Sequence, residues 1–301
     1  MQAEIGQGQP ADQAPRATRN HLLAGRRQAE RARQIVILLI LVLGAITMIV
    51  PFEWMLATSL SRSANSAMPR IPQFWPSDAS FFNYRIALTN LPVLRYYWNS
   101  FIVTTAATLG LLLFSSMAGY AFAKGRFPGK SALFVVLLTT LMIPFEMRMV
   151  PMFLEMHALH LDDNLLALIL PFVAGGFGTF LMRQYMTSIP DELLDAARMD
   201  GANEFVIYSQ IVMPLCGPVL AALTVLSVLW RWNDVLWPLL VISNPKLYTV
   251  TLGLAVEGRS QGTLTGVVLA NTTLAILPIV VVYVLLQRFI VRGIMLSGLK
   301  G

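Results

Sequence analysis

The sequence predicts an all-α fold: a polytopic membrane bundle of six transmembrane helices, with both termini in the cytoplasm. Three observations support this. Of the 301 residues, 56% are hydrophobic and 13% are charged, whereas about 25% of an average soluble domain is charged. Six apolar stretches are long enough to cross about 30 Å of hydrocarbon. Lysine and arginine gather in alternate connecting segments, as the positive-inside rule requires.

The six predicted spans are residues 35–57, 98–120, 131–153, 164–186, 213–235 and 268–290. The first is longer than the core of a secretory signal, and no clear cleavage site follows it, so we expect it to be retained. We therefore predict one transmembrane domain, 35–295. It lies between a basic tail, 1–34, expected to be disordered, and a short cytoplasmic C-terminal tail, 296–301.

Basic residues fix the predicted orientation. With the N-terminal tail inside, fourteen of the 22 lysines and arginines fall in cytoplasmic segments and eight fall in outer ones, although the outer segments are longer. This distribution supports an N-in, C-in topology. The net charge of +6 is therefore an orientation signal, and we expect no nucleic acid partner.

Two outer segments are expected to cover the bundle. Residues 58–97 carry aromatic side chains suited to the membrane interface, namely Trp75, Phe81, Phe82, Tyr96 and Tyr97. Residues 236–267 contain the turn signal Asn244-Pro245 and should fold back against the spans.

Small residues predict close packing inside the bundle. Gly175, Gly176 and Gly178 cluster in the fourth span, and small residues let helix backbones approach each other in lipid. The single cysteine, Cys216, stands among apolar residues. We expect it to be a buried hydrophobic side chain and not a reactive thiol.

The connection between the fourth and fifth spans, residues 188–212, predicts two short helices with a break. Ser188 is the expected N-cap, and Asp191 and Glu192 place negative charge where the helix dipole favours it. We expect an apolar face formed by Leu193, Ala196, Ala197 and Met199, and a sharp turn at Gly201.

This compact element is suited to docking on a second protein. Its alanines would present a smooth surface, and the carboxylates of Glu192, Asp195 and Asp200 could pair with basic residues of a partner. The alternative is a helix lying on the membrane surface. Such helices usually carry lysine and arginine, whereas this one is mainly acidic, so docking is favoured.

One motif in this connection resembles a known family. Asp195-Ala196-Ala197, three residues, Gly201, nine residues and then Ile211-Val212-Met213-Pro214 is similar to Glu-Ala-Ala, Gly and Ile-x-Leu-Pro at the same spacing. That motif marks permease subunits of bacterial ATP-binding-cassette (ABC) importers, here the carbohydrate group that includes the second maltose permease subunit. Asp195 replaces the family's glutamate and Met213 its leucine.

The resemblance extends over nearly everything after residue 35. It includes the segment from Tyr120 to Lys130, Arg183-Gln184, and Trp232-Asn233-Asp234. It implies a protein of the bacterial inner membrane that carries sugars or oligosaccharides, with a glycerol phosphodiester as the alternative substrate.

The resemblance also implies partners: a second permease subunit, two ATPase subunits that hold ATP and magnesium, and an extracellular solute-binding protein. Residues 190–207 would form a pair of coupling helices seated on an ATPase, and the C-terminal tail could reach the ATPases as well. The implied coupling residues are Glu192, Asp195, Ala196, Ala197, Asp200, Gly201, Ala202 and Pro214.

Motifs for chemistry within this chain are absent from the sequence. No Gly-x-x-x-x-Gly-Lys-Ser/Thr loop occurs, so ATP is bound by a partner or not used. His157, His160, Asp162 and Asp163 lie close together in one loop, where a solvated turn is favoured over a metal site. No catalytic set is evident, so we expect a non-catalytic subunit without a cofactor of its own.

Two sets of residues are candidates for the substrate path. Glu146 and Arg148 lie in the third span, where ionisable groups are costly unless they face water or each other. They could line the path, pair with a neighbouring subunit or point to the outer interface. Trp232, Asn233 and Asp234 could contact a sugar, although anchoring of a helix end by the tryptophan is favoured.

A competing hypothesis is an ion-coupled transporter or channel. Such a protein should show inverted repeats and buried carboxylates near the membrane midplane, and neither is clear in the sequence. A membrane-bound enzyme would need a catalytic set. Co-purification with an ATPase would separate the importer from the ion-coupled alternative.

Overall fold

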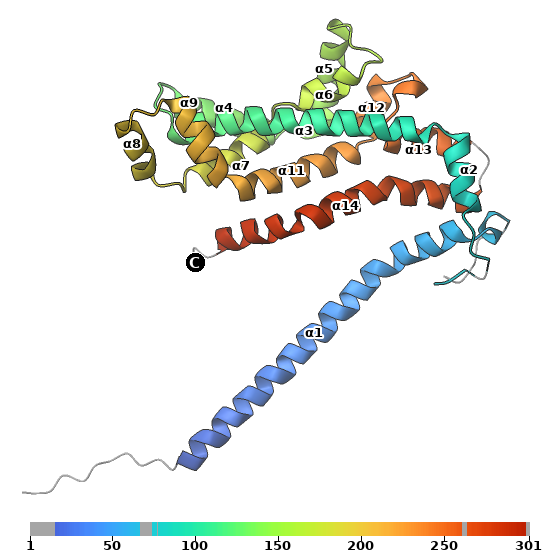
Figure 1. Cartoon of the computed structure of the whole chain (residues 1–301), viewed down its shortest axis with the longest axis horizontal. Helices are drawn as coiled ribbons and strands as arrows, with labels where there is room; N and C mark the ends of the chain where they lie inside the picture. Colours follow the sequence, from blue (N-terminus) through green and yellow to red (C-terminus); the bar gives the residue numbers. More distant parts are fainter. Residues whose placement is uncertain (1–15, 67–73, 77, 261–263, 299–301) are drawn as a thin grey trace, which may run out of the picture. The chain divides into compact units, whose positions relative to one another are not determined.

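The computed structural model describes residues 16–66, 74–76, 78–260 and 264–298. Within them the chain is helical apart from turns, irregular segments and one isolated bridge between Ser61 and Ala79. The chain divides into two units, residues 1–55 and 56–301 (Figure 1). The predicted class, a helical membrane protein, is confirmed.

Helix α1 (Arg16–Leu60) accounts for the described part of the first unit. The expectation of a disordered tail is wrong for residues 16–34, because this segment is rich in alanine, leucine, glutamine and arginine, which favour helix, and it continues the apolar helix without a break. The apolar side chains from Ile35 to Ile49 are mostly exposed, as a lipid-facing helix requires. Residues 1–15 of the predicted tail lie outside the described residues.

Among the described residues, four helical segments without a sharp bend are long and apolar enough to span a membrane. They are Arg33–Leu60 within α1, α3 (Val93–Lys124), Leu165–Met186 and Thr265–Leu285 within α14 (Thr265–Gly298). The third of these comprises α6 (Leu165–Ile169), η2 (Leu170–Phe172) and α7 (Gly176–Met186). Of the predicted C-terminal tail, residues 296–298 belong to α14, and 299–301 lie outside the described residues.

The third and fifth predicted spans are not straight helices. Helix α4 (Lys130–Leu141) meets α5 (Phe145–Ala158) at 102°, and Glu204–Leu215 meets α11 (Gly217–Trp232) at 76°. Proline explains both bends, because it disfavours helical geometry in the preceding residue and removes a backbone donor. Pro144 precedes α5, and Pro214 and Pro218 flank the second bend. The count reaches six spans only if each bent pair crosses once.

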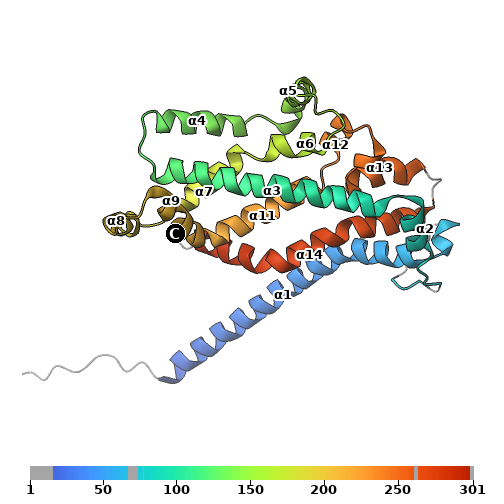
Figure 2. The ribbon, with the colours of Figure 1, turned by 45° about the horizontal axis from the view of Figure 1, so that its top comes forward.

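Helix α3 runs the length of the second unit, and α7 and α11 pack against it (Figures 1 and 2). Glycine permits this approach: a Cβ on Gly119 would lie 2.6 Å from Cβ of Met182, and one on Gly178 would overlap Ser115. The predicted close packing around the glycines of the fourth span is confirmed. A buried hydrogen bond of 2.8 Å between the hydroxyls of Thr108 and Ser227 also joins α3 to α11.

An asparagine side chain of α2 (Phe82–Asn90) ties the segment after α1 to the end of α1. This segment contains η1 (Ser63–Asn65) and α2. Asn83 is fully buried, and its Nδ2 donates to the carbonyls of Ser59 and Ser61 at 2.9 and 2.8 Å. Tyr96 and Tyr97, predicted to lie in the outer segment, belong instead to α3, which begins at Val93.

The second outer segment folds back against the bundle, as predicted. It contains α12 (Leu236–Val241), η4 (Pro245–Leu247) and α13 (Val250–Ser260). Asn99 of α3 donates through Nδ2 to the carbonyls of Lys246 and Tyr248 at 3.0 and 2.9 Å. The indole of Trp237, fully buried, donates to the carbonyl of Ala167 at 2.9 Å.

Candidate functional site

The connection between α7 and α11 forms two short helices, as the sequence predicts. Helix α8 (Asp191–Met199) is followed by α9 (Glu204–Val206), the π-helical turn η3 (Ile207–Val212) and α10 (Met213–Leu215). Gly201 has a φ of +84°, a geometry that glycine adopts without strain. The amides of Gly201 and Ala202 donate to the carbonyls of Arg198 and Ala197, which closes the end of α8 as a Schellman motif.

The predicted start of α8 is partly wrong. Pro190 occupies the N-cap position, and no side chain caps the helix there. The hydroxyl of Ser188 instead donates to the carbonyl of Tyr185 at 2.7 Å, which satisfies the end of α7. Proline fixes a backbone geometry suited to entering the helix, and Asp191 and Glu192 provide the negative charge of the first turn, as expected.

The apolar face predicted for docking is only partly exposed on α8, because its Ala197 is buried. Leu194 and Ala197 are buried, whereas Leu193 and Met199 are 43% and 88% exposed and Ala196 is exposed. Two apolar stripes lie side by side on this short helix, and the pattern alone cannot show which one faces inward. The exposed stripe of Leu193, Ala196 and Met199 is thus the surface available to a partner.

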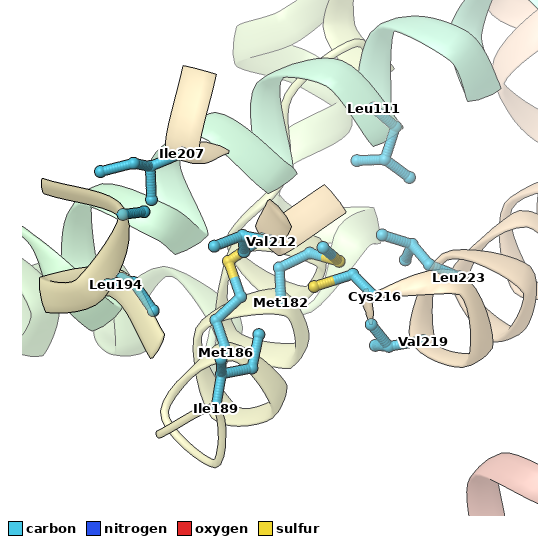
Figure 3. Packing of buried hydrophobic residues seen from close by; sticks show 11 residues of the cluster. Leu111, Met182, Met186, Ile189, Leu194, Ile207, Val212, Cys216, Val219 and Leu223 are labelled. Carbon is cyan, nitrogen blue, oxygen red and sulfur yellow. The ribbon is translucent and has the colours of Figure 1, made fainter. Parts of the chain in front are cut away.

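Leu194 and Ala197 pack into a core cluster that joins α8 to the bundle (Figure 3). The cluster draws residues from α3, α7, α8, η3 and α11, and Cys216 lies in it, fully buried as predicted. Its other buried members are Leu111, Met182, Met186, Ile189, Ile207, Val212, Val219 and Leu223. Helix α8 therefore has an apolar base.

Polar contacts join α8, α9 and α3. Arg198 donates through Nε to Glu204 at 2.8 Å and through Nη1 to Asp195 at 2.7 Å. The hydroxyl of Tyr120 donates to the second oxygen of Glu204 at 2.7 Å. The bond from Arg198, followed by that from Tyr120, lowers the pKa of the Glu204 carboxyl. Asp195, expected to be free for a partner, is thus paired within the chain.

A contact that the sequence analysis missed holds the start of α8. Lys124, the last residue of α3, has a side chain only 7% exposed. Its Nζ donates to the carbonyl of Ile189 and to Oδ1 of Asp191, both at 2.6 Å, and lowers the pKa of the Asp191 carboxyl. No pattern signals this pair, because 67 residues separate the two partners.

A polar cavity of about 150 Å³ lies between the α3–α4 turn and α8. Its lining residues are Ala123, Lys124, Gly125, Arg126, Lys130, Asp191, Leu194, Asp195 and Arg198. Glu192 and Asp200 are exposed outside it, and neither forms an ion pair with the described residues. These two carboxylates remain available to a partner.

Residues 110–296 match the model of the family described as the binding-protein-dependent transport system inner membrane component. The chain belongs to this family. The resemblance to importer permeases found in the sequence is thereby confirmed, together with the inner-membrane location. The matched region of this inner membrane component includes the connection between α7 and α11, residues 188–212.

Relatives of this inner membrane component are transport permeases. It is 38% identical to the arabinooligosaccharides transport system permease protein AraQ of Halalkalibacterium halodurans, over 76% of this chain and 82% of the relative. It is 35% identical to the sn-glycerol-3-phosphate transport system permease protein UgpE of Brucella suis, over 85% and 94%. One solved structure, a bacterial ABC transporter involved in alginate import, matches with a TM-score of 0.77 and 27% identity, over 87% of this chain and 98% of that one.

Both sets of residues predicted for the substrate path lie near one aromatic pair, Phe145 and Phe172. Arg148 lies beside Phe145, and Asp234 is linked to Phe172 through Arg231. Glu146 and Arg148 are exposed in the first turn of α5, and the guanidinium of Arg148 lies 5.9 Å from the ring centre of Phe145. Phe145 is 6.0 Å from Phe172, whose ring centre lies 3.5 Å from the guanidinium of Arg231. Sequence reasoning missed Arg231 and both phenylalanines as parts of this group.

Within the second predicted set, all three side chains have partners inside the permease. Trp232 is buried and donates to the carbonyl of Ala275 at 3.0 Å, which favours the helix-anchor interpretation. Asp234 accepts from Arg231 and from the amide of Trp237, each at 3.2 Å. Asn233 is exposed, and its side chain donates to the carbonyl of Leu229.

The loop after α5 is tied by hydrogen bonds. His157 pairs with Asp162 at 2.8 Å on the surface, and Asp163 accepts from the amides of Ser243 and Asn244. Asp163 thus connects this loop to the segment after α12. Among the described residues, no three His, Cys, Asp or Glu side chains come close enough to hold a metal ion.

Proposed function

We propose that this chain is the permease half of an ATP-driven importer and that α8 docks on a separate ATPase subunit. The observation that carries the proposal is the exposed apolar stripe of α8. Met199 is 88% exposed, Leu193 43% and the nearby Phe205 73%. Large apolar side chains gathered on a projecting element indicate a contact with another protein.

The surroundings of this stripe support docking. The inward side of α8 is buried in the core cluster, and Lys124 and Tyr120 tie the two ends of this helix to α3. The exposed stripe is therefore rigid before a partner binds. A preformed surface loses little conformational entropy on binding. Glu192 and Asp200 flank the stripe and can pair with basic residues of the ATPase.

In this proposal the complete transporter contains a second permease subunit, two ATPase subunits and an extracellular solute-binding protein. ATP and magnesium are bound by the ATPases, and the permease contributes no catalytic group. Closure of the ATPases would move α8 and switch the bundle between inward-facing and outward-facing states.

The substrate proposed is a sugar or an oligosaccharide, with a glycerol phosphodiester as the alternative. The arabinooligosaccharide relative favours the first class and the sn-glycerol-3-phosphate relative the second. The aromatic pair Phe145 and Phe172, with Arg148 and Arg231 beside it, supports a path that accepts hydroxyl-rich or anionic solutes.

Co-expression with the partner ATPase tests the proposal. We expect the permease to retain the ATPase through purification in detergent and to support ATP-dependent uptake in proteoliposomes. Met199→Glu places an unpaired carboxylate in the docking stripe, so ATPase retention should fall about tenfold or more. Gln184→Glu introduces the same charge at an exposed position of α7 and serves as the matched control.

Two results would overturn the proposal. One is equal ATPase retention by both variants, which would place the docking surface elsewhere. The other is full uptake by vesicles that lack ATP but hold an ion gradient, which would establish an ion-coupled transporter instead.

A further inference from the structure

Helix α8 has covalent connections at both ends, and neither reaches α3. Residues 187–190 join it to α7, and the turn at Gly201 joins it to α9. A pull on α8 through these links alone could rotate it about the two connections. Yet α3 is the helix that packs against both α7 and α11, so it is the element through which movement would reach the rest of the bundle.

The first contact between α8 and α3 is made by Lys124. Its side chain is only 7% exposed, and its Nζ bonds both to the backbone of Ile189 and to the side chain of Asp191, each at 2.6 Å. Ile189 is itself buried in the core cluster. Short bonds from an ionised donor are about twice as strong as neutral ones. Lys124 therefore fixes the residues at which α8 begins.

The second contact lies one helical turn earlier on α3. Tyr120 bonds to Glu204, Glu204 bonds to Arg198, and Arg198 bonds to Asp195, at distances of 2.7 to 2.8 Å. Tyr120 and Lys124 are four residues apart, so they share one face of α3. This chain of bonds passes through Glu204, which follows the Gly201 turn, and reaches Arg198 in the last turn of α8. The two contacts together hold both ends of the helix.

We propose that Lys124 and Tyr120 are positioning residues that make α8 and α3 move as one body. The inference rests on the proposed function, since it assigns to these residues the transfer of ATPase motion into the bundle. A single contact with α3 would leave α8 able to rotate about that contact. The second contact prevents this rotation. Without these two contacts α8 would still dock, because its exposed stripe is unchanged. Only its apolar base of Leu194 and Ala197 would then hold it, and most of its displacement would be lost in local rotation.

The test compares uptake with ATP hydrolysis in proteoliposomes that hold the complete transporter. For the double variant Lys124→Met with Tyr120→Phe, we expect ATPase retention and hydrolysis to stay within about twofold while solute carried per ATP falls about tenfold or more. Lys124→Arg, which keeps the charged donor, should recover part of the loss. Lys130→Met is the matched control, because Lys130 bonds only to the carbonyls of Ala123 and Gly125 in its own turn.

A second measurement needs no ATPase. Spin labels at the exposed positions Met199 on α8 and Met117 on α3, with Cys216→Ala as background, report the distance between the two helices by pulsed electron resonance. One narrow distribution is expected for the parent and for Lys130→Met, and a broad one for the double variant. This readout also applies where the double variant assembles poorly.

The outcomes separate this inference from the proposed function. A narrow distribution in the double variant, or an unchanged number of solute molecules per ATP, would overturn the positioning role even if the importer works. An equal loss in Lys130→Met would also overturn it, since that variant leaves both contacts intact. A parent complex without ATP-driven uptake would refute the proposed function, while the distance measurement still decides whether these residues fix α8.

Discussion

Replacing Leu194 by alanine should loosen α8 from the bundle. The leucine side chain is only 1% exposed and packs in the core cluster beneath the docking helix. Removing a fully buried leucine side chain costs its transfer free energy and leaves a cavity, together about 3 kcal/mol. That loss corresponds to an increase of about 100-fold in the population of states with α8 detached.

Hydrogen exchange of the α8 amides measures this population directly. In detergent-solubilised protein, exchange should accelerate about 100-fold in Leu194→Ala. Leu193→Ala deletes the same atoms one residue earlier, where the side chain is 43% exposed, and should change exchange less than about fivefold. Equal effects of the two substitutions, or a larger effect at Leu193, would show that the buried face of α8 has been wrongly assigned.

Three further predictions concern packing, pH and the substrate path. Gly119→Ala should lower the free energy of unfolding by about 1–3 kcal/mol in thermal melts, because its Cβ would overlap a methionine of α7. Gly44→Ala is the control and should not destabilise the protein, because a Cβ there would have no atom within 4 Å. The pKa of Asp191 is lowered in the folded state, so its contribution is present above the ordinary value of 3.8 and lost as the pH falls below it. Relative to the intrinsic exchange rate of an unprotected amide at the same pH, exchange of α8 should therefore accelerate in acid, and Asp191→Asn should remove that step. A parent profile identical to the variant's would contradict the ion pair. Arg148→Gln should raise the half-saturating solute concentration for uptake about tenfold, and Arg85→Gln on α2 should not; unchanged uptake with the first variant excludes Arg148 from the path.

The sequence predicts where the chain enters lipid better than how it bends there. Apolar length alone places the spans, because hydrocarbon demands about 20 apolar residues per helix. The bends of 102° and 76° depend on which of several prolines interrupts a helix. Pro51 and Pro278 lie inside the continuous helices α1 and α14, whereas Pro144 lies in the break between α4 and α5. A single sequence does not show which proline is accommodated inside a helix and which one ends it.

The connection formed by residues 188–212 was predicted in outline, but its contacts with the rest of the bundle were not. Gly201 and the break it creates follow from local chemistry, and the structure confirms them. The inward stripe of α8 is decided by the core cluster, which gathers residues from Leu111 to Leu223. The bond from Lys124 to Asp191 joins segments 67 residues apart. Local patterns carry no information about such contacts.

The buried asparagine group at the other end of the second unit has a consequence for biosynthesis. Asn65 bonds through Nδ2 to Asn83 at 2.6 Å, and its Oδ1 accepts from the amide of Gly266 at 3.0 Å, across 201 residues of sequence. This bond can form only after the start of α14 has left the ribosome. Until then, the turn that follows α1 lacks its final partner, so this turn and α14 complete their folding together.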